Sequence, residues 1–137
     1  MKTIEITARA LIVKNKQIVL AKHKKLNVYF MPGGHGEFGE TVETALTREI
    51  KEEMGIDVKL GKLWAIMENF FNDVHEISFI YTAEIPDKPI ASCEQDLEIF
   101  WTQLSDLKKL NHLPIQLVKP LINDHSKQGP FHFIYKD

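Results

Sequence analysis

GGHGEFGETVETALTREIKEEMGI, residues 33–56, joins a glycine-rich segment to a helix that is apolar at its start and acidic at its end. Thr41 is a suitable N-cap residue, and Gly55 stands where a left-handed residue would end the helix. Between them, apolar side chains recur three or four positions apart, at Val42, Ala45, Leu46 and Ile50. The stretch therefore predicts a helix over residues 42–54 that packs its apolar stripe on a sheet.

Three carboxylates continue this stripe toward the end of the helix. Glu49 follows Leu46 by three residues, and Glu52 and Glu53 follow Glu49 by three and four. Carboxylates on an inward face are costly unless a positive charge neutralises them. Oxygen ligands at these offsets suit Mg²⁺ or Mn²⁺, which also retain water and phosphate ligands. The sequence therefore predicts a divalent cation at this end of the helix.

The segment around the helix supplies further polar groups. Arg48 lies just off the acidic face and can hold Glu40 through a bidentate pair, either as a structural salt bridge or to orient the acidic set. Glycines allow the backbone to approach a metal or a phosphate closely, and the segment contains Gly33, Gly34, Gly36 and Gly39.

Composition limits the class of protein. The chain has 137 residues, of which 44% are hydrophobic and 26% charged, so we expect one globular domain over residues 1–137. The formal net charge of −2 argues against a nucleic-acid polymer or a membrane surface as the partner. The N-terminal stretch shows neither a signal peptide nor a membrane span, so we expect a cytoplasmic protein. The single cysteine, Cys93, is interpreted as a small apolar filler.

Strands and helices alternate along the remainder of the chain. The expected strands are residues 3–13 and 17–23, joined as a hairpin, then 58–71, 75–85, 97–103 and an edge strand at 131–136. Residues 26–40 and 85–96 are expected to form loops, and residues 105–110 and 114–125 to be helical. The fold class is therefore α/β, with a mixed sheet covered by at least two helices.

The spacing of residues 34–56 resembles the signature box of the Nudix hydrolases at every defined position. Gly34 is followed after five residues by Glu40, and after seven more by the sequence REIKEEMGI at 48–56. Seven fixed identities and two aliphatic positions agree with the box, and the order of the surrounding elements is similar to that of the family. The resemblance implies an α/β/α sandwich and Mg²⁺-dependent (or Mn²⁺-dependent) hydrolysis of a nucleoside diphosphate linked to another group, by attack of water on phosphorus.

The resemblance also implies roles for single residues. Glu52 and Glu53 resemble metal ligands of the family, and Glu49 resembles a metal ligand or the general base. The carbonyl of Gly33 is similar to a further metal ligand of the family. Arg48, paired with Glu40, would orient the carboxylates of Glu49, Glu52 and Glu53. Members of the family differ in whether the base comes from the helix or from a later loop. The later loop offers Glu94, Asp96 and Glu98; Glu49 is preferred here, with Glu94 and Glu98 as its rivals.

The substrate is a nucleotide-like small molecule whose identity the sequence leaves open. Aromatic side chains could stack on a base, and polar ones could contact its edge. Packing in the core is the alternative for the aromatic residues, and a solvated loop is the alternative for the late acids. The substrate-binding candidates are Tyr29, Glu68, Phe70, His75, Glu94 and Glu98, together with Phe30, Asn69, Phe71 and Glu76.

Two other functions stay open at the level of the sequence. A Nudix-like domain can act as a nucleotide sensor or interaction module, but such domains usually lose carboxylates that this chain keeps. An isomerase acting on a prenyl diphosphate would use the same metal site with a nearby cysteine and an additional acid. The number of metals, the bond cleaved and the oligomeric state are open, and a homodimer is compatible with the resemblance.

Overall fold

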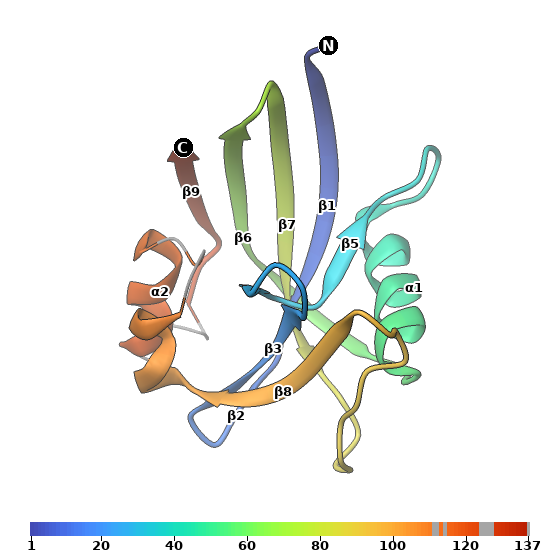
Figure 1. Ribbon diagram of the computed structural model, residues 1–137, viewed down its shortest axis with the longest axis vertical. Coiled ribbons are helices and arrows are strands. Elements are labelled where there is room, and N and C mark those ends of the chain that lie inside the picture. Colours follow the sequence, from blue (N-terminus) through green and yellow to red (C-terminus); the bar gives the residue numbers. More distant parts are fainter. Residues whose placement is uncertain (111–112, 114, 124–127, 137) are drawn as a thin grey trace.

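The computed structural model describes residues 1–110, 113, 115–123 and 128–136 (Figure 1). The first helix, α1 (Val42–Met54), begins and ends where the sequence predicts. The hydroxyl of Thr41 accepts a hydrogen bond from the Thr44 backbone N–H, which satisfies one of the free amides of the first turn. Gly55 adopts the left-handed conformation with φ of 68°, and its N–H donates to the Lys51 carbonyl. Local signals therefore fix both ends of α1.

One sheet has five strands in the order β5-β1-β7-β6-β9. Its strands are β1 (Thr3–Leu11), β5 (Gly33–His35), β6 (Lys59–Phe71), β7 (Val74–Glu84) and β9 (Phe131–Lys136). The β1–β7 and β6–β9 pairs are parallel, whereas β1–β5 and β6–β7 are antiparallel. The sheet is therefore mixed, and β9 forms one of its edges, as predicted.

The second sheet is built around β3 (Gln17–His23). This strand pairs with β2 (Val13–Lys14), with β4 (Val28–Phe30) and, over its whole length, with β8 (Leu97–Gln103). A short 3₁₀ segment, η1 (Leu104–Lys109), follows β8, and α2 (Ile115–Ile122) follows it. No helix in the described part of the chain is long and apolar enough to cross a membrane.

Successive residues of a strand face opposite sides, and this alternation divides the core into two apolar clusters. The first cluster includes Ala8, Ala10, Leu46 and Ile50 and packs α1 against the strands. The second includes Leu11, Trp64, Leu117 and Leu121 and packs α2 against the other side. The two helices lie on opposite sides of the strands (Figure 1), which confirms the predicted mixed sheet between helices.

The structure corrects three details of the sequence prediction. Strands 3–13 and 17–23 do not form one long hairpin, because the chain changes sheets after Leu11 and only the short β2 pairs with β3. The expected loop over 26–40 contains β4 and β5, and the expected helix over 105–110 is a 3₁₀ segment. Positions 114, 124 and 125 of the last predicted helix lie outside the described residues.

Candidate active site

The last turn of α1 carries a buried carboxylate beside the glycine-rich strand β5. Glu53 is 3% exposed, and its Oε1 accepts a hydrogen bond of 3.1 Å from the Gly33 N–H. Its Oε2 is buried without a hydrogen-bond partner. Burial raises the pKa of the Glu53 carboxyl to about 7, and Glu49 and Glu94 raise it further, whereas Gly33 and Arg9 act in the opposite direction. This oxygen is available for a ligand.

Arg48 links α1 through hydrogen bonds to the glycine-rich segment at residues 33–40. Its Nε and Nη2 donate to the two carboxylate oxygens of Glu40 at 2.8 and 2.9 Å, which confirms the predicted bidentate pair. This contact lowers the pKa of Glu40 to about 2. Nη1 also donates to Glu49 at 3.1 Å and to Glu52 at 3.4 Å, and Nη2 donates to the His35 carbonyl. One guanidinium thus fixes three carboxylates relative to β5.

Two glycines of β5 are needed for close contacts. A Cβ on Gly34 would lie 2.6 Å from the Glu49 carboxylate, so any other residue would force that carboxylate to move. Gly33 has φ of 140°, and a Cβ there would clash with the backbone of Ala8. The carbonyl of Gly33 accepts a 3.0 Å hydrogen bond from Arg9, which leaves one lone pair of this oxygen for another partner.

The donor set fits a hard divalent cation. Carboxylates come from the last two turns of α1, and the Gly33 carbonyl comes from the adjacent strand. The exposure of these groups differs, because Glu53 is buried, the Glu49 side chain is 18% exposed and the Glu52 side chain is 52% exposed. Mg²⁺ and Mn²⁺ take oxygen ligands and usually keep several waters, so an unpaired buried oxygen beside partly exposed carboxylates is compatible with such an ion. Among the described residues, the oxygens of Glu49, Glu52 and Glu53 do not all lie within 4.8 Å of one another.

A cavity of about 410 Å³ opens beside this region, on the face of the five-stranded sheet opposite α1. Its polar lining includes Arg9, Asn69, Glu76 and Ser78, and its apolar lining includes Tyr29, Phe30, Met31 and Leu117. The volume and the mixture of aromatic and polar groups are typical of a site for a small organic ligand. Arg9 lines the cavity, and its guanidinium donates to the carbonyl of Gly33, a residue that also bonds Glu53 of α1. The cavity therefore adjoins the acidic end of α1.

Comparison with known families agrees with this geometry. The family model described as the NUDIX domain matches residues 4–121. The chain belongs to the Nudix family.

Relatives of this Nudix chain include an ADP-ribose pyrophosphatase from Methanocaldococcus jannaschii, which is 31% identical over 110 residues, covering 77% of this chain and 65% of the relative. An 8-oxo-dGTP diphosphatase from Escherichia coli is 31% identical over 88 residues, covering 61% of this chain and 68% of the relative. The chain spans 65%, 32% and 46% of the lengths of three of the relatives it matches.

Solved structures agree with the Nudix fold. A MutT Nudix hydrolase from Burkholderia pseudomallei has a TM-score of 0.75 and 27% identity, covering 86% of this chain and 98% of that one. A Nudix hydrolase from Nitrosomonas europaea has a TM-score of 0.78 at 16% identity, covering 97% of this chain and 79% of that one.

The structure separates the residues named as substrate-binding candidates for this Nudix domain. Tyr29 and Phe70 border the 410 Å³ cavity, but the Phe70 ring stacks on His75, with 4.3 Å between the ring centroids. Glu68 and His75 do not line it, because Glu68 alternates along β6 with the cavity residues Met67 and Asn69 and faces the other side of the sheet. There Glu68 accepts hydrogen bonds from His75 at 2.8 Å and His132 at 2.7 Å, with the histidine nitrogens as donors, and these contacts lower its pKa.

The late acids also lie in different places. Glu94 is exposed, but it is close enough to Glu53 to raise the pKa of that carboxyl, and the neighbouring Cys93 N–H donates to the Glu53 carbonyl at 2.7 Å. Glu98 is an exposed residue of β8, opposite Lys22 in the register with β3. Cys93 is itself exposed, so its interpretation as a small apolar filler is wrong. Its Sγ lies beside Gly55, at the C-terminal end of α1.

Arg9 is the residue of this region that sequence reasoning missed. Its guanidinium donates to the carbonyls of Met31 and Gly33 and lies 5.4 Å from the centre of the Phe30 ring. Burial lowers its pKa, although nearby glutamates oppose this effect. A signal was present, because polar residues alternate with apolar ones along β1, at Glu5, Thr7 and Arg9. That alternation indicates a polar face of β1, and this face forms part of the cavity.

Proposed function

We propose that this Nudix domain hydrolyses a nucleoside diphosphate linked to another moiety, in a reaction that depends on Mg²⁺ or Mn²⁺. The observation that carries the proposal is the unpaired, buried Oε2 of Glu53, next to the Gly33 amide and the other two acids of α1. A buried carboxylate oxygen without a partner is unfavourable unless a ligand satisfies it.

Glu49, Glu52, Glu53 and the Gly33 carbonyl would hold the ion. When bound, it would neutralise charge on the diphosphate oxygens and acidify the attacking water. Arg48 keeps Glu49 and Glu52 in place through its hydrogen bonds, and its bidentate pair with Glu40 anchors the helix to the glycine loop. Preorganised groups of this kind reduce the reorganisation needed during the reaction.

Glu49 is our choice for the general base. Its carboxylate is partly shielded, contacts Arg48 and lies against Gly34, so its position is defined. A base must be held within reach of the water that it deprotonates. Glu94 is the rival that lies close to Glu53, but its side chain is exposed.

We propose that the nucleoside occupies the 410 Å³ cavity, with the diphosphate directed toward α1. Tyr29 offers a ring surface, and Asn69 offers a hydrogen-bonding group for a base. Arg9 lies between the cavity and Gly33, where a cation suits a phosphate group. The relatives act on ADP-ribose and 8-oxo-dGTP according to their names, which supports a substrate of this general class.

The test is product analysis by chromatography, with Mg²⁺ and with a chelator. The panel contains nucleoside triphosphates, oxidised nucleotides, nucleotide sugars, ADP-ribose and dinucleoside polyphosphates. We expect metal-dependent cleavage of one class, and a loss of at least about a hundredfold in kcat for Glu53→Gln. Glu37→Gln is the matched control, since it removes one exposed charge from the same segment and should keep the activity.

A fully active Glu53→Gln enzyme would refute the assignment of the metal site. Cleavage that persists in the chelator would refute the dependence on a divalent ion. Circular dichroism of each variant distinguishes a loss of chemistry from a loss of folding.

A further inference from the structure

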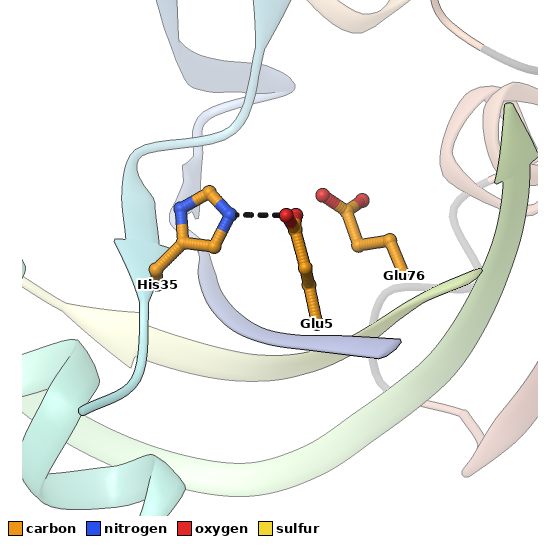
Figure 2. Close-up of side chains that lie close together, drawn as sticks. All are labelled: Glu5, His35 and Glu76. Carbon is orange, nitrogen blue, oxygen red and sulfur yellow. Dashed lines mark hydrogen bonds and ion pairs between the residues drawn. The ribbon is translucent and has the colours of Figure 1, made fainter. Parts of the chain in front are cut away.

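A second group of metal-ligating side chains lies on the other side of β5 from the acidic helix. Figure 2 shows Glu5, His35 and Glu76 pointing toward one another from the neighbouring strands β1, β5 and β7. One ligand atom from each lies within 4.8 Å of the other two, and His35 Nε2 is 2.9 Å from Glu5 Oε2. Because Gly34 faces Glu49, the next residue, His35, faces the opposite side of the strand.

These donors require only small movements to bind one ion. Ligand atoms at about 2.0–2.1 Å from a zinc ion are separated from each other by roughly 3–4 Å. All three side chains come from strands paired in register, with Glu5 directly opposite Glu76 in the parallel β1–β7 pair. The backbone of β5 is also fixed, because the His35 carbonyl accepts a hydrogen bond from Arg48.

Glu76 is oriented by groups outside this set of donors. Its Oε1 accepts hydrogen bonds from Asn69 Nδ2 at 3.0 Å and from Ser78 Oγ at 3.2 Å. The Ser78 hydroxyl is buried and shares a 2.6 Å hydrogen bond with the Thr7 hydroxyl. Such outer contacts fix a ligating carboxylate and strengthen metal sites considerably.

The charges also favour a cation at this position. Like charges directly opposite each other on neighbouring strands are destabilising, and Glu5 and Glu76 form such a pair. Arg9 is close enough to Glu76 to interact with its charge, but the Arg9 guanidinium donates hydrogen bonds to the carbonyls of Met31 and Gly33. A divalent ion held by both carboxylates would neutralise the pair.

We infer that Glu5, His35 and Glu76 form a second metal site, distinct from the acidic end of α1, for a divalent transition ion such as Zn²⁺. The imidazole nitrogen selects such an ion over Mg²⁺, which prefers oxygen ligands. The side chains of Glu5 and His35 are 36% and 61% exposed, so water can complete the coordination.

The experiment titrates the protein with Zn²⁺ by calorimetry, and with Co²⁺ by its visible absorption, in an excess of Mg²⁺. We expect His35→Ala to weaken binding of Zn²⁺ and Co²⁺ at this site by at least about tenfold. His23→Ala is the control, because it removes a partly exposed histidine of β3 whose Nδ1 accepts a hydrogen bond from the Leu26 N–H. Thermal melting of each variant establishes that it is folded.

Glu53→Gln separates this proposal from the proposed hydrolase activity. We expect this variant to bind Zn²⁺ and Co²⁺ like the wild type, even if the protein hydrolyses none of the substrates tested. Unchanged binding in folded His35→Ala would overturn the proposal and leave only a His35–Glu5 ion pair. Loss of all Zn²⁺ and Co²⁺ binding in Glu53→Gln would also overturn it, because the ion would then occupy the acidic helix.

Discussion

At the scale of single residues, the candidate site depends on contacts that exclude even one methyl group. Gly34→Ala would place a Cβ 2.6 Å from the Glu49 carboxylate, which must then move away from Arg48. Displacement of a positioned catalytic group by about 1 Å can cost roughly a hundredfold in rate. We therefore expect Gly34→Ala to reduce kcat by about that factor, while the circular dichroism spectrum stays that of the wild type.

Gly36→Ala is the matched control in the same segment. Its Cβ would meet its nearest atom at 3.8 Å, which is an ordinary van der Waals contact. Steady-state kinetics should therefore give nearly the wild-type kcat for this variant. Equal losses in the two variants would show that the backbone of the loop, rather than the position of Glu49, controls the rate.

The raised pKa of Glu53 predicts how the free energy of unfolding depends on pH. Its carboxyl titrates near 4.5 in the unfolded chain, and burial raises its pKa to about 7 in the folded protein. Between these pH values the folded state retains a proton that the unfolded state has lost, so the free energy of unfolding decreases as pH rises. In a chelator, this group should remove about 3 kcal/mol of stability between pH 4.5 and 7.

Urea denaturation at pH 5 and pH 8 measures this effect. Glu53→Gln cannot titrate at this position, so the difference between the wild type and the variant isolates Glu53 from the histidines. The wild type should lose more stability than Glu53→Gln as the pH rises. Parallel pH profiles for the two proteins would contradict the raised pKa.

At the scale of elements, α1 has to stop at a fixed residue for its acids to face β5. Gly55→Ala would force alanine into the left-handed conformation and place its Cβ 3.0 Å from Cys93 Sγ. A non-glycine residue in this conformation costs about 1–2 kcal/mol. We expect a loss of that size in the free energy of unfolding, measured by urea denaturation.

Gly55→Asn tests the cause of that loss. Asparagine tolerates the left-handed conformation better than alanine does, yet it also carries a Cβ. A smaller loss for Gly55→Asn than for Gly55→Ala would identify the backbone conformation as the cause. Equal losses would instead identify the contact with Cys93.

At the scale of the whole molecule, features set by residues close together in the sequence were predicted, whereas features set by pairing between distant segments were not. The bounds of α1 and the pair between Arg48 and Glu40 were predicted, because periodicity, caps and a separation of eight residues are local. The strand β5 was not predicted, since Gly33 and Gly34 have little intrinsic strand preference and form a strand through their pairing with β1.

Long-range pairing accounts for what else was missed. The division into two sheets depends on β3 pairing with β8 and β1 pairing with β7, which no short window of sequence encodes. The same pairing places Glu5 beside Glu76 and puts Glu68 on the face away from the cavity. The acids of α1 were therefore identifiable from sequence, whereas the neighbours of Arg9 required the assembled sheet.

The division of the core into two clusters bears on directed evolution of this domain. Leu46 and Ile50 hold α1 in one cluster, whereas Met31, Met67 and Leu117 belong to the other cluster and line the cavity. A library confined to the cavity side would reshape the space for a ligand without changing the side chains that seat α1. New specificities can thus be selected on one side of the strands while the other side is inherited unchanged.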